Sequence, residues 1–292
     1  MSGASWVDAE VAKAGAELVR LRRELHRHPE LSRQEFATTR RIAERLVALG
    51  LEVHVRPEGN GLYADLTPPG FRPDEHRTVA VRADIDALPI VEATALPYAS
   101  ETPGVMHACG HDMHSAMVLG VALALASQHS TLPGRVRFFF QHSEEVAPGG
   151  ADELVDFGCM QGVDAVLGLH VDPVMDVGTI GIKDGSMTAS ADAFELEVRG
   201  RGGHAARPHH CVDPVFVATQ IATALYQTAG RAFDARDPVV ITISSVLAGE
   251  GFNVIPNTAT LRGTVRTLSG EARREIGPLF RRIAGGICGI HG

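Results

Sequence analysis

Short apolar stretches that end in acidic residues or histidine recur along the first part of the chain, with helix-like stretches between them. TVAVRADID, RVRFFFQHSEE and AVLGLHVD are the clearest of these stretches. Strands that alternate with helices favour a mostly parallel sheet that helices cover on both faces. Ligands bind such open α/β sheets at the carboxyl ends of the strands. The pattern therefore predicts an α/β fold that gathers polar side chains at one sheet edge.

Periodicity and turn residues predict the individual elements of this part. Helices are expected over about 5–28, 33–49 and 111–128, followed by a polar, helical stretch at 149–162. The expected strands have the sequences LEVHVR, LYADLT, TVAVRADI, RVRFFFQ and DAVLGLHV. Together these elements predict a first, metal-binding catalytic domain over residues 1–186.

The predicted order of strands and helices changes from about residue 187. The order becomes strand ADAFELEVRGR, helix 213–230, strands PVVITISSVLAG and TATLRGTVRT, and helix 270–285. A βαββα order favours a small, separate α+β domain. A chain of 292 residues also exceeds the length at which a single core stops growing, so a second domain over 187–292 is expected.

Charge and cysteine usage narrow the classes of partner. The net charge of -8 gives no general attraction to nucleic acid or to an anionic membrane, which favours a small-molecule partner. Charged residues interrupt the apolar stretches near the start, so neither a signal peptide nor a membrane span is expected, and the cytoplasm is the default location. Four widely spaced cysteines favour reduced thiols over a disulfide framework.

The residues that carry chemistry follow the predicted strands or begin the helix at 111–128. They are Asp84, Asp86, Cys109, His111, Glu144, Glu145 and His170. Thiol, imidazole and carboxylate donors together suit zinc, manganese, cobalt or nickel better than calcium or magnesium. The helix start is expected to favour the thiolate form of Cys109.

Five of these residues also have a plain structural interpretation. The two aspartates can cap a loop, the two glutamates can form a solvated strand end, and His170 can be a hydrogen-bonded core histidine. Their joint position at one sheet edge is what favours a metal site. A nicotinamide-dependent dehydrogenase is disfavoured, because no G-x-G-x-x-G motif follows a predicted strand.

Ordered motifs from about residue 18 onward resemble the metal-dependent aminoacylase family. They are LRRELHRHPELSRQE, VRADIDALPI, MHACGHDMHSAMVLG, FQHSEE, GLH, GRGGHAARPH, NVIP and GTVRT. This family includes hippurate hydrolases, indole-acetyl-amino-acid hydrolases and N-acyl-amino-acid amidohydrolases, within the glutamate carboxypeptidase-like superfamily. The resemblance implies a zinc-peptidase-like catalytic domain with an inserted, ferredoxin-like lid and dimerisation domain.

The resemblance also implies roles for the residues of the first domain. It makes Cys109, His111, Glu145 and His170 ligands of divalent metal ions, two per site in the family. Glu144 is then the general base that accepts a proton from water, and Asp86 orients a neighbouring ligand. His107 and His114 match no ligand and are expected to orient ligands or to pack on the helix.

In the second domain the resemblance implies residues that bind an N-acyl amino acid. His204 is the hydrogen-bond donor to the reacting carbonyl, and in dimeric relatives this histidine reaches the partner's site, which implies a homodimer. Arg266 and Asn253 anchor the substrate carboxylate. Taken alone, His204 is more often a histidine of a surface turn, and Arg266 is more often a solvated strand residue.

Relatives are expected to continue for roughly another hundred residues. The chain is therefore expected to stop before the lid's last strand and before one further histidine ligand. Such a site would keep one ion or bind both weakly. The alternative to an active amidohydrolase is accordingly a catalytically impaired relative that retains partial metal binding or dimerisation.

Overall fold

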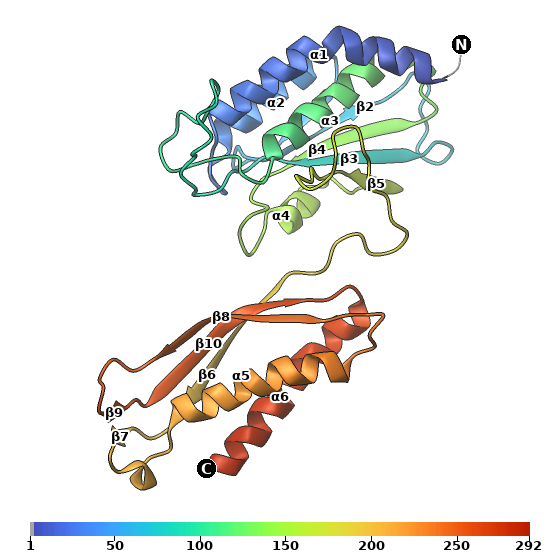
Figure 1. Cartoon of the computed structure of the whole chain (residues 1–292). Coiled ribbons are helices and arrows are strands. Elements are labelled where there is room, and N and C mark those ends of the chain that lie inside the picture. Colours follow the sequence, from blue (N-terminus) through green and yellow to red (C-terminus); the bar gives the residue numbers. More distant parts are fainter. Residues whose placement is uncertain (1–2) are drawn as a thin grey trace. The chain divides into compact units, whose positions relative to one another are not determined.

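A computed structural model describes residues 3–292. The chain forms two compact units, Met1–Asp176 and Val177–Gly292 (Figure 1). Each unit has its own buried apolar core, so each is described by itself.

The first unit is a mixed sheet with helices on both faces. Its helices are α1 (Gly3–Arg27), α2 (Phe36–Ala48), α3 (His111–Ala126) and α4 (Ala151–Asp156), with a short 3-10 turn at His129–Thr131. Its strands are β1 (Glu52–Val55), β2 (Leu62–Leu66), β3 (Thr78–Asp84), β4 (Arg135–Gln141) and β5 (Ala165–Gly168), in the spatial order β1-β2-β4-β3-β5. These elements confirm the predicted α/β class.

The three consecutive phenylalanines of β4 show why both faces must be covered. Phe138 and Phe140 are buried in the larger core beneath α1, α2 and α3. Phe139 belongs to a separate buried cluster with Leu154 of α4, and α4 lies on the opposite face of the sheet from α1, α2 and α3 (Figure 1). Successive side chains of a strand alternate between faces, so a continuous apolar run requires a layer on each side.

Strand pairing fixes where the site-bearing residues emerge. β3 pairs in parallel with both β4 and β5, whereas β1, β2 and β4 pair antiparallel. In the β3–β4 register, Asp84 lies opposite Gln141, so the two strands end level with each other. The loops that follow β3, β4 and β5 therefore begin at the same sheet edge.

The second unit has the predicted βαββα order with two small additions. Its main elements are β6 (Asp192–Arg199), α5 (Pro214–Ala232), β8 (Val240–Ala248), β10 (Thr258–Arg266) and α6 (Gly270–His291). The strands form an antiparallel sheet in the order β6-β10-β8. The additions are a 3-10 turn at Pro208–His210 and the strand pair β7 (Gly203–His204) and β9 (Val254–Ile255), which the sequence did not predict.

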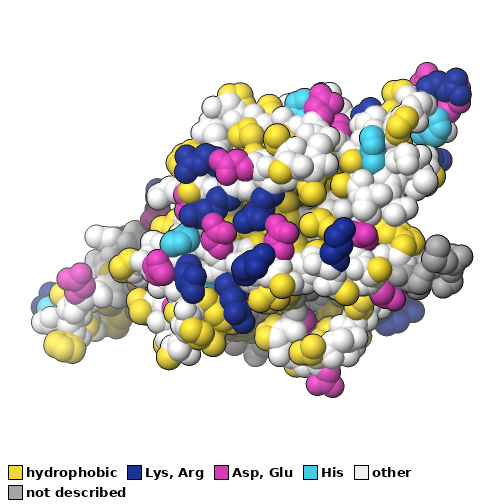
Figure 2. All heavy atoms as spheres, turned by 90° about the horizontal axis from the view of Figure 1, so that it is seen from above, with side chains coloured by type: hydrophobic (Ala, Val, Ile, Leu, Met, Phe, Trp, Pro, Cys, Tyr) yellow, Lys and Arg dark blue, Asp and Glu magenta, His cyan; other side chains and the backbone are white. Residues whose placement is uncertain are grey.

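Charges of both signs mix on the outer surface of the first unit. Arg45 of α2 pairs with Glu17 and Glu24 of α1, and Arg41 also pairs with Glu24. Basic and acidic side chains are interspersed on the face shown in Figure 2.

None of the helices in the described part of the chain combines the length and apolar character needed to cross a membrane.

We expect Asp65→Asn to lower the free energy of unfolding by about 3 to 5 kcal/mol, because it leaves a buried guanidinium without its charge partner. Both carboxylate oxygens of Asp65 accept from Arg137, at 2.7 Å each, between β2 and β4. Urea denaturation measures the loss. Asp234→Asn is the control, since Asp234 pairs with Arg236 at the exposed surface; an equal loss there would contradict the prediction.

Candidate metal centre

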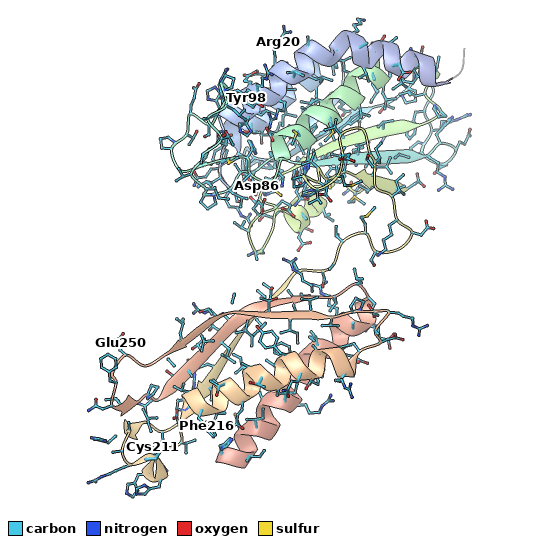
Figure 3. All side chains as sticks on the ribbon, in the orientation of Figure 1. Arg20, Asp86, Tyr98, Cys211, Phe216 and Glu250 are labelled. Carbon is cyan, nitrogen blue, oxygen red and sulfur yellow. The ribbon has the colours of Figure 1, made fainter. Side chains whose placement is uncertain are left out.

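The candidate centre lies at the edge where β3, β4 and β5 end. Asp84 is the last residue of β3, and Asp86 follows it by two residues (Figure 3). The Glu144–Glu145 pair follows β4, and His170 follows β5. The fourth contribution comes from the N-terminus of α3, which begins at His111 and is preceded by Cys109. The structure thus brings together all the metal and base candidates that the sequence placed in the first domain.

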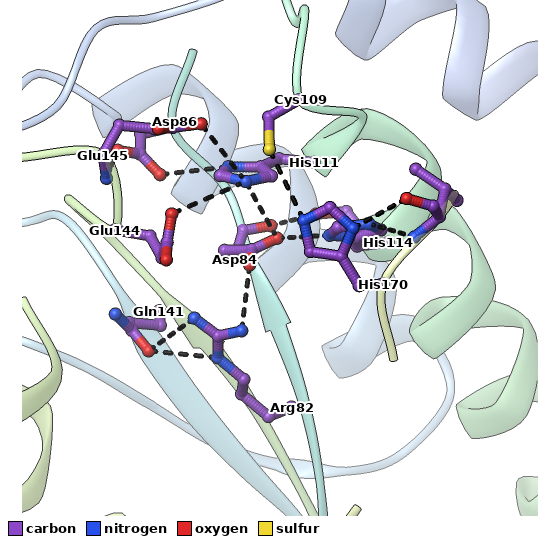
Figure 4. A network of polar contacts seen from close by, with 12 residues as sticks. Arg82, Asp84, Asp86, Cys109, His111, His114, Gln141, Glu144, Glu145 and His170 are labelled. Atoms are coloured by element: carbon purple, nitrogen blue, oxygen red, sulfur yellow. Dashed lines mark hydrogen bonds and ion pairs between the residues drawn. The ribbon is translucent and has the colours of Figure 1, made fainter. Parts of the chain in front are cut away.

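His111 is the central group of this cluster (Figure 4). Its ring is buried, and Nδ1 lies 3.2 Å from Oδ1 of Asp86. This contact orients Nε2 toward the glutamates, at 3.7 Å from Glu145 Oε1 and 3.9 Å from Glu144 Oε2. Asp86 is therefore placed to orient His111, the role that the resemblance implies for it.

Cys109 and His170 close the other side of the cluster. Cys109 Sγ lies 3.5 Å from His170 Nε2, and His170 Nδ1 is 2.7 Å from the carbonyl oxygen of Val171. An Nδ1–H that donates to this carbonyl leaves Nε2 as the free nitrogen. Donor atoms of Cys109, His111 and His170 lie within 4.8 Å of one another, as do those of His111, Glu144 and Glu145.

Asp86 and Glu144 differ in how readily their carboxyl groups lose a proton. Burial raises the pKa of Asp86, but hydrogen bonds from His111, the Glu145 amide and Ser32 outweigh it and lower that pKa to about 2. Burial raises the pKa of Glu144, and the nearby carboxylates of Glu145 and Asp84 raise it further against the opposing effect of His111. Asp86 is therefore a fixed anion, whereas Glu144 accepts protons more readily than an ordinary glutamate.

The surroundings of Cys109 oppose the thiolate that the helix start was expected to favour. Burial raises the pKa of Cys109 to about 12, and the carboxylates of Glu145, Glu144 and Asp84 contribute. The thiol lies just before the helix, where the dipole effect is worth about 1 kcal/mol or less. Burial and the nearby negative charges together outweigh that contribution.

Two orphaned atoms test whether a metal ion fits. His111 Nε2 and Glu145 Oε1 are buried and have no hydrogen-bond partner among residues 3–292. A buried polar atom without a partner is costly, and both atoms are lone-pair donors that a cation satisfies. The thiol and imidazoles nearby are ligands that borderline divalent ions prefer. The residues therefore fit a divalent metal ion.

Asp84 and His114 form a third group with donor atoms close to His111. Asp84 is already paired with His114 Nδ1 at 2.6 Å and with Arg82 Nη1 at 2.9 Å. The other nitrogen of His114 accepts from the Val171 amide at 3.0 Å (Figure 4). Asp84 therefore holds His114, and His114 in turn holds the loop that carries His170. The sequence did not predict this supporting role for Asp84.

His107 has no comparable contact. Its side chain is buried, and neither ring nitrogen has a hydrogen-bond partner within the described chain. Burial lowers the pKa of His107 to about 4, so the ring is neutral near pH 7. His107 packs near the tilted ring of His26, which suits a packing role on the helix side of the site.

The remaining predicted residues lie in the second unit. His204 is in β7, and the amide of the following Ala205 donates to the carbonyl oxygen of Asn253 at 2.9 Å. Arg266 is at the far end of β10, about 26 Å along the strand from its start. All three polar side chains are exposed. Within this unit the structure therefore brings together His204 and Asn253 but not Arg266.

Comparison with known proteins gives consistent matches. Residues 80–272 match the model of peptidase family M20/M25/M40. The chain is 43% identical to the N-acetylcysteine deacetylase of Bacillus subtilis over 276 residues, which is 94% of this chain and 71% of that protein. It is 41% identical over 282 residues to the N-acyl-L-amino acid amidohydrolase of Geobacillus stearothermophilus, covering 97% of this chain and 75% of the other.

A solved structure agrees with these matches. The Bacillus subtilis YXEP protein, described as a dinuclear metal binding peptidase from the M20 family, is 40% identical with a TM-score of 0.80. The match covers 95% of this chain and 71% of that one. This neighbour supports divalent metal binding by a cluster of the kind shown in Figure 4.

We expect His111→Ala to abolish tight binding of divalent metal, because His111 belongs to all three groups of candidate donors. Equilibrium dialysis with Zn²⁺ or Co²⁺ followed by metal analysis measures binding. Metal at 100 times its dissociation constant also stabilises the wild-type protein by about 2.7 kcal/mol, which the variant loses. His129→Ala is the control, since His129 is in none of these donor groups and its Nε2 hydrogen-bonds to the carbonyl oxygen of Thr67 at 2.6 Å. Wild-type binding by His111→Ala would contradict the assignment.

Proposed function

Because this chain belongs to peptidase family M20/M25/M40, we propose that it is a metal-dependent amidohydrolase that cleaves the amide bond of N-acyl amino acids. The observation that carries the proposal is the cluster of thiol, imidazole and carboxylate donors with Glu144 beside it. The relatives named as deacetylase and amidohydrolase support the substrate class. Acetyl, benzoyl and indole-acetyl groups are the acyl groups to compare.

The proposed ligands are Cys109, His111, Glu145 and His170. The solved M20 neighbour described as a dinuclear metal binding peptidase supports a pair of ions, and zinc, manganese, cobalt or nickel are the elements that suit these donors. A divalent ion bound there supplies Lewis acidity, which polarises the amide carbonyl and lowers the pKa of a nearby water. Asp86 keeps the ring of His111 oriented by accepting from Nδ1.

Glu144 is the proposed general base. Its side chain is 41% exposed, so substrate and water can approach the carboxylate. The raised pKa brings it closer to the range in which a carboxylate accepts and returns a proton efficiently. It takes a proton from the attacking water and delivers that proton to the nitrogen of the leaving amine.

His204, Asn253 and Arg266 are proposed to bind the substrate, on the strength of the resemblance. The guanidinium of Arg266 suits a carboxylate, and His204 suits the reacting carbonyl oxygen as a donor. His204 pairs with Val254, which precedes the start of β10, and Arg266 lies about 26 Å along that strand from Thr258. This span exceeds the length of an N-acyl amino acid, so Arg266 and His204 of one chain are proposed to bind different substrate molecules. This separation supports a homodimer in which His204 serves the partner's site.

We expect Glu144→Gln to lower the turnover of N-acetyl and N-benzoyl amino acids by about 10²- to 10⁴-fold, because the amide cannot accept the proton. Metal content should stay at the wild-type value. Release of the free amino acid measures turnover, and Glu101→Gln at an exposed position is the control. Turnover by Glu144→Gln at the wild-type rate would rule out this base.

Mixing two inactive variants tests the shared site. His204→Ala and Arg266→Ala should each be nearly inactive, and a refolded equimolar mixture should regain about a quarter of wild-type activity, from one intact site in each mixed dimer. Analytical ultracentrifugation establishes the dimer. A dimeric mixture without regained activity would show that each chain uses its own His204.

A further inference from the structure

The motif HPELSRQE lies between α1 and α2 and has no role in the proposed reaction. Its last residue, Glu35, occupies the N-cap position of α2, yet its side chain makes no cap hydrogen bond. The carboxylate of Glu30 accepts from the amides of Ala37 and Thr38 instead, at 3.1 and 2.7 Å. An N-cap side chain usually accepts from these first amides, so Glu30 frees the side chain of Glu35 for another contact.

That contact is with Ser143, the residue immediately before the Glu144–Glu145 pair. Glu35 is fully buried, and its Oε1 accepts from the Ser143 amide at 2.6 Å and from the Ser143 hydroxyl at 3.2 Å. The same hydroxyl accepts from the Arg33 amide at 2.9 Å. Residues 108 positions apart in the sequence are thereby joined inside the core.

Ser143 adopts a conformation that needs such support. Its φ of 53° lies in the left-handed region, which costs a residue with a Cβ atom about 1 kcal/mol or more. The turn at Ser143 redirects the chain from β4 so that Glu144 and Glu145 approach His111. An unsupported serine would relax toward the common backbone regions and move both glutamates.

The segment also holds the second acidic loop. The hydroxyl of Ser32 donates to Oδ2 of Asp86 at 2.7 Å, and the Glu145 amide donates to the same oxygen at 3.0 Å. The amide of Ala87 donates to the carbonyl of Glu30 at 2.8 Å. Residues 30–35 therefore connect the loop after β3 to the loop after β4.

We propose that Glu35 is a positioning residue that holds Ser143 in its left-handed turn and so sets the positions of Glu144 and Glu145; this inference rests on the function proposed above for that pair. The other oxygen of Glu35 accepts from Asn60 Nδ2 at 3.1 Å, and Asn60 Oδ1 accepts from Arg56 Nη1 at 2.9 Å. Arg56 thus fixes the orientation of the Asn60 amide, which must present its NH₂ group to Glu35.

Because Asn60 donates to Glu35, exchanging donor and acceptor between the two residues gives a compensating pair of substitutions, Glu35→Gln and Asn60→Asp. Glu35→Gln places an NH₂ group against the NH₂ group of Asn60, and the Asn60 amide cannot turn over without opposing Arg56 in the same way. Asn60→Asp alone places two carboxylates together. The double variant restores a donor facing an acceptor and keeps the acceptor for Arg56, so it should recover what each single variant loses.

Two measurements on the full chain test the proposal. In hydrogen–deuterium exchange, Glu35→Gln and Asn60→Asp should each speed exchange of residues 142–150 at least about tenfold, while the double variant returns to the wild-type rate. In Co²⁺ titrations followed by absorption, each single variant should raise the dissociation constant by about 10- to 100-fold and the double variant should restore it. Peptides covering residues 108–115 should exchange as in wild type throughout.

Asp65→Asn controls for general loss of stability, because Asp65 is also a buried carboxylate of this unit but contacts Arg137 rather than the site loops. It should leave exchange at 142–150 and Co²⁺ affinity unchanged. Wild-type exchange and affinity in Glu35→Gln, or loosening that Asn60→Asp does not reverse, would overturn the proposal. If the wild-type chain binds no Co²⁺, the proposed function fails, and the exchange rates alone still decide the role of Glu35.

Discussion

The first unit is arranged around one constraint: several carboxylates surround the buried imidazole of His111. Carboxylates of Asp84, Asp86, Glu144 and Glu145 all approach His111 within 3.9 Å. Buried charges of one sign are tolerated only where hydrogen bonds or opposite charges compensate them. The two aspartates receive such compensation from Arg82, His114 and Ser32. Glu145 Oε1 has no hydrogen-bond partner in the described chain, so a cation beside the glutamates would compensate its charge.

The fold supplies this arrangement through parallel strand pairing. Because β3 lies between β4 and β5, Asp84 at its end and Asp86 just after it sit between the loop with the glutamates and the loop with His170. Helix α3 begins at the same edge of the sheet and contributes His111 from its first turn. Support for the loops comes from distant parts of the chain, since Glu35 contacts Ser143 and His114 contacts Val171. The site is therefore held by contacts across the whole unit.

The sequence predicted the parts of this site that local pattern encodes. Alternation of strands and helices identified the sheet edge, and the strand RVRFFFQ was predicted with its observed bounds. The left-handed turn at Ser143 was not predicted, because serine has no strong preference for it and its partner Glu35 is 108 residues away. The short strands β7 and β9 were also missed, since two residues each carry no periodicity. The metal and substrate roles of the individual residues stay predictions.

Cys109 illustrates how surroundings decide between two chemistries that one motif allows. A cysteine 3.5 Å from a histidine has the spacing of a thiol nucleophile and its base, as well as that of two metal ligands. A nucleophilic cysteine needs a depressed pKa, which positive neighbours supply. Here burial and the adjacent carboxylates raise the pKa of Cys109 to about 12, so the thiol is a poor nucleophile near neutral pH. The same carboxylates attract a cation, and a bound divalent ion would reverse the local charge and favour the thiolate. The charge distribution therefore favours a ligand over a nucleophile at Cys109.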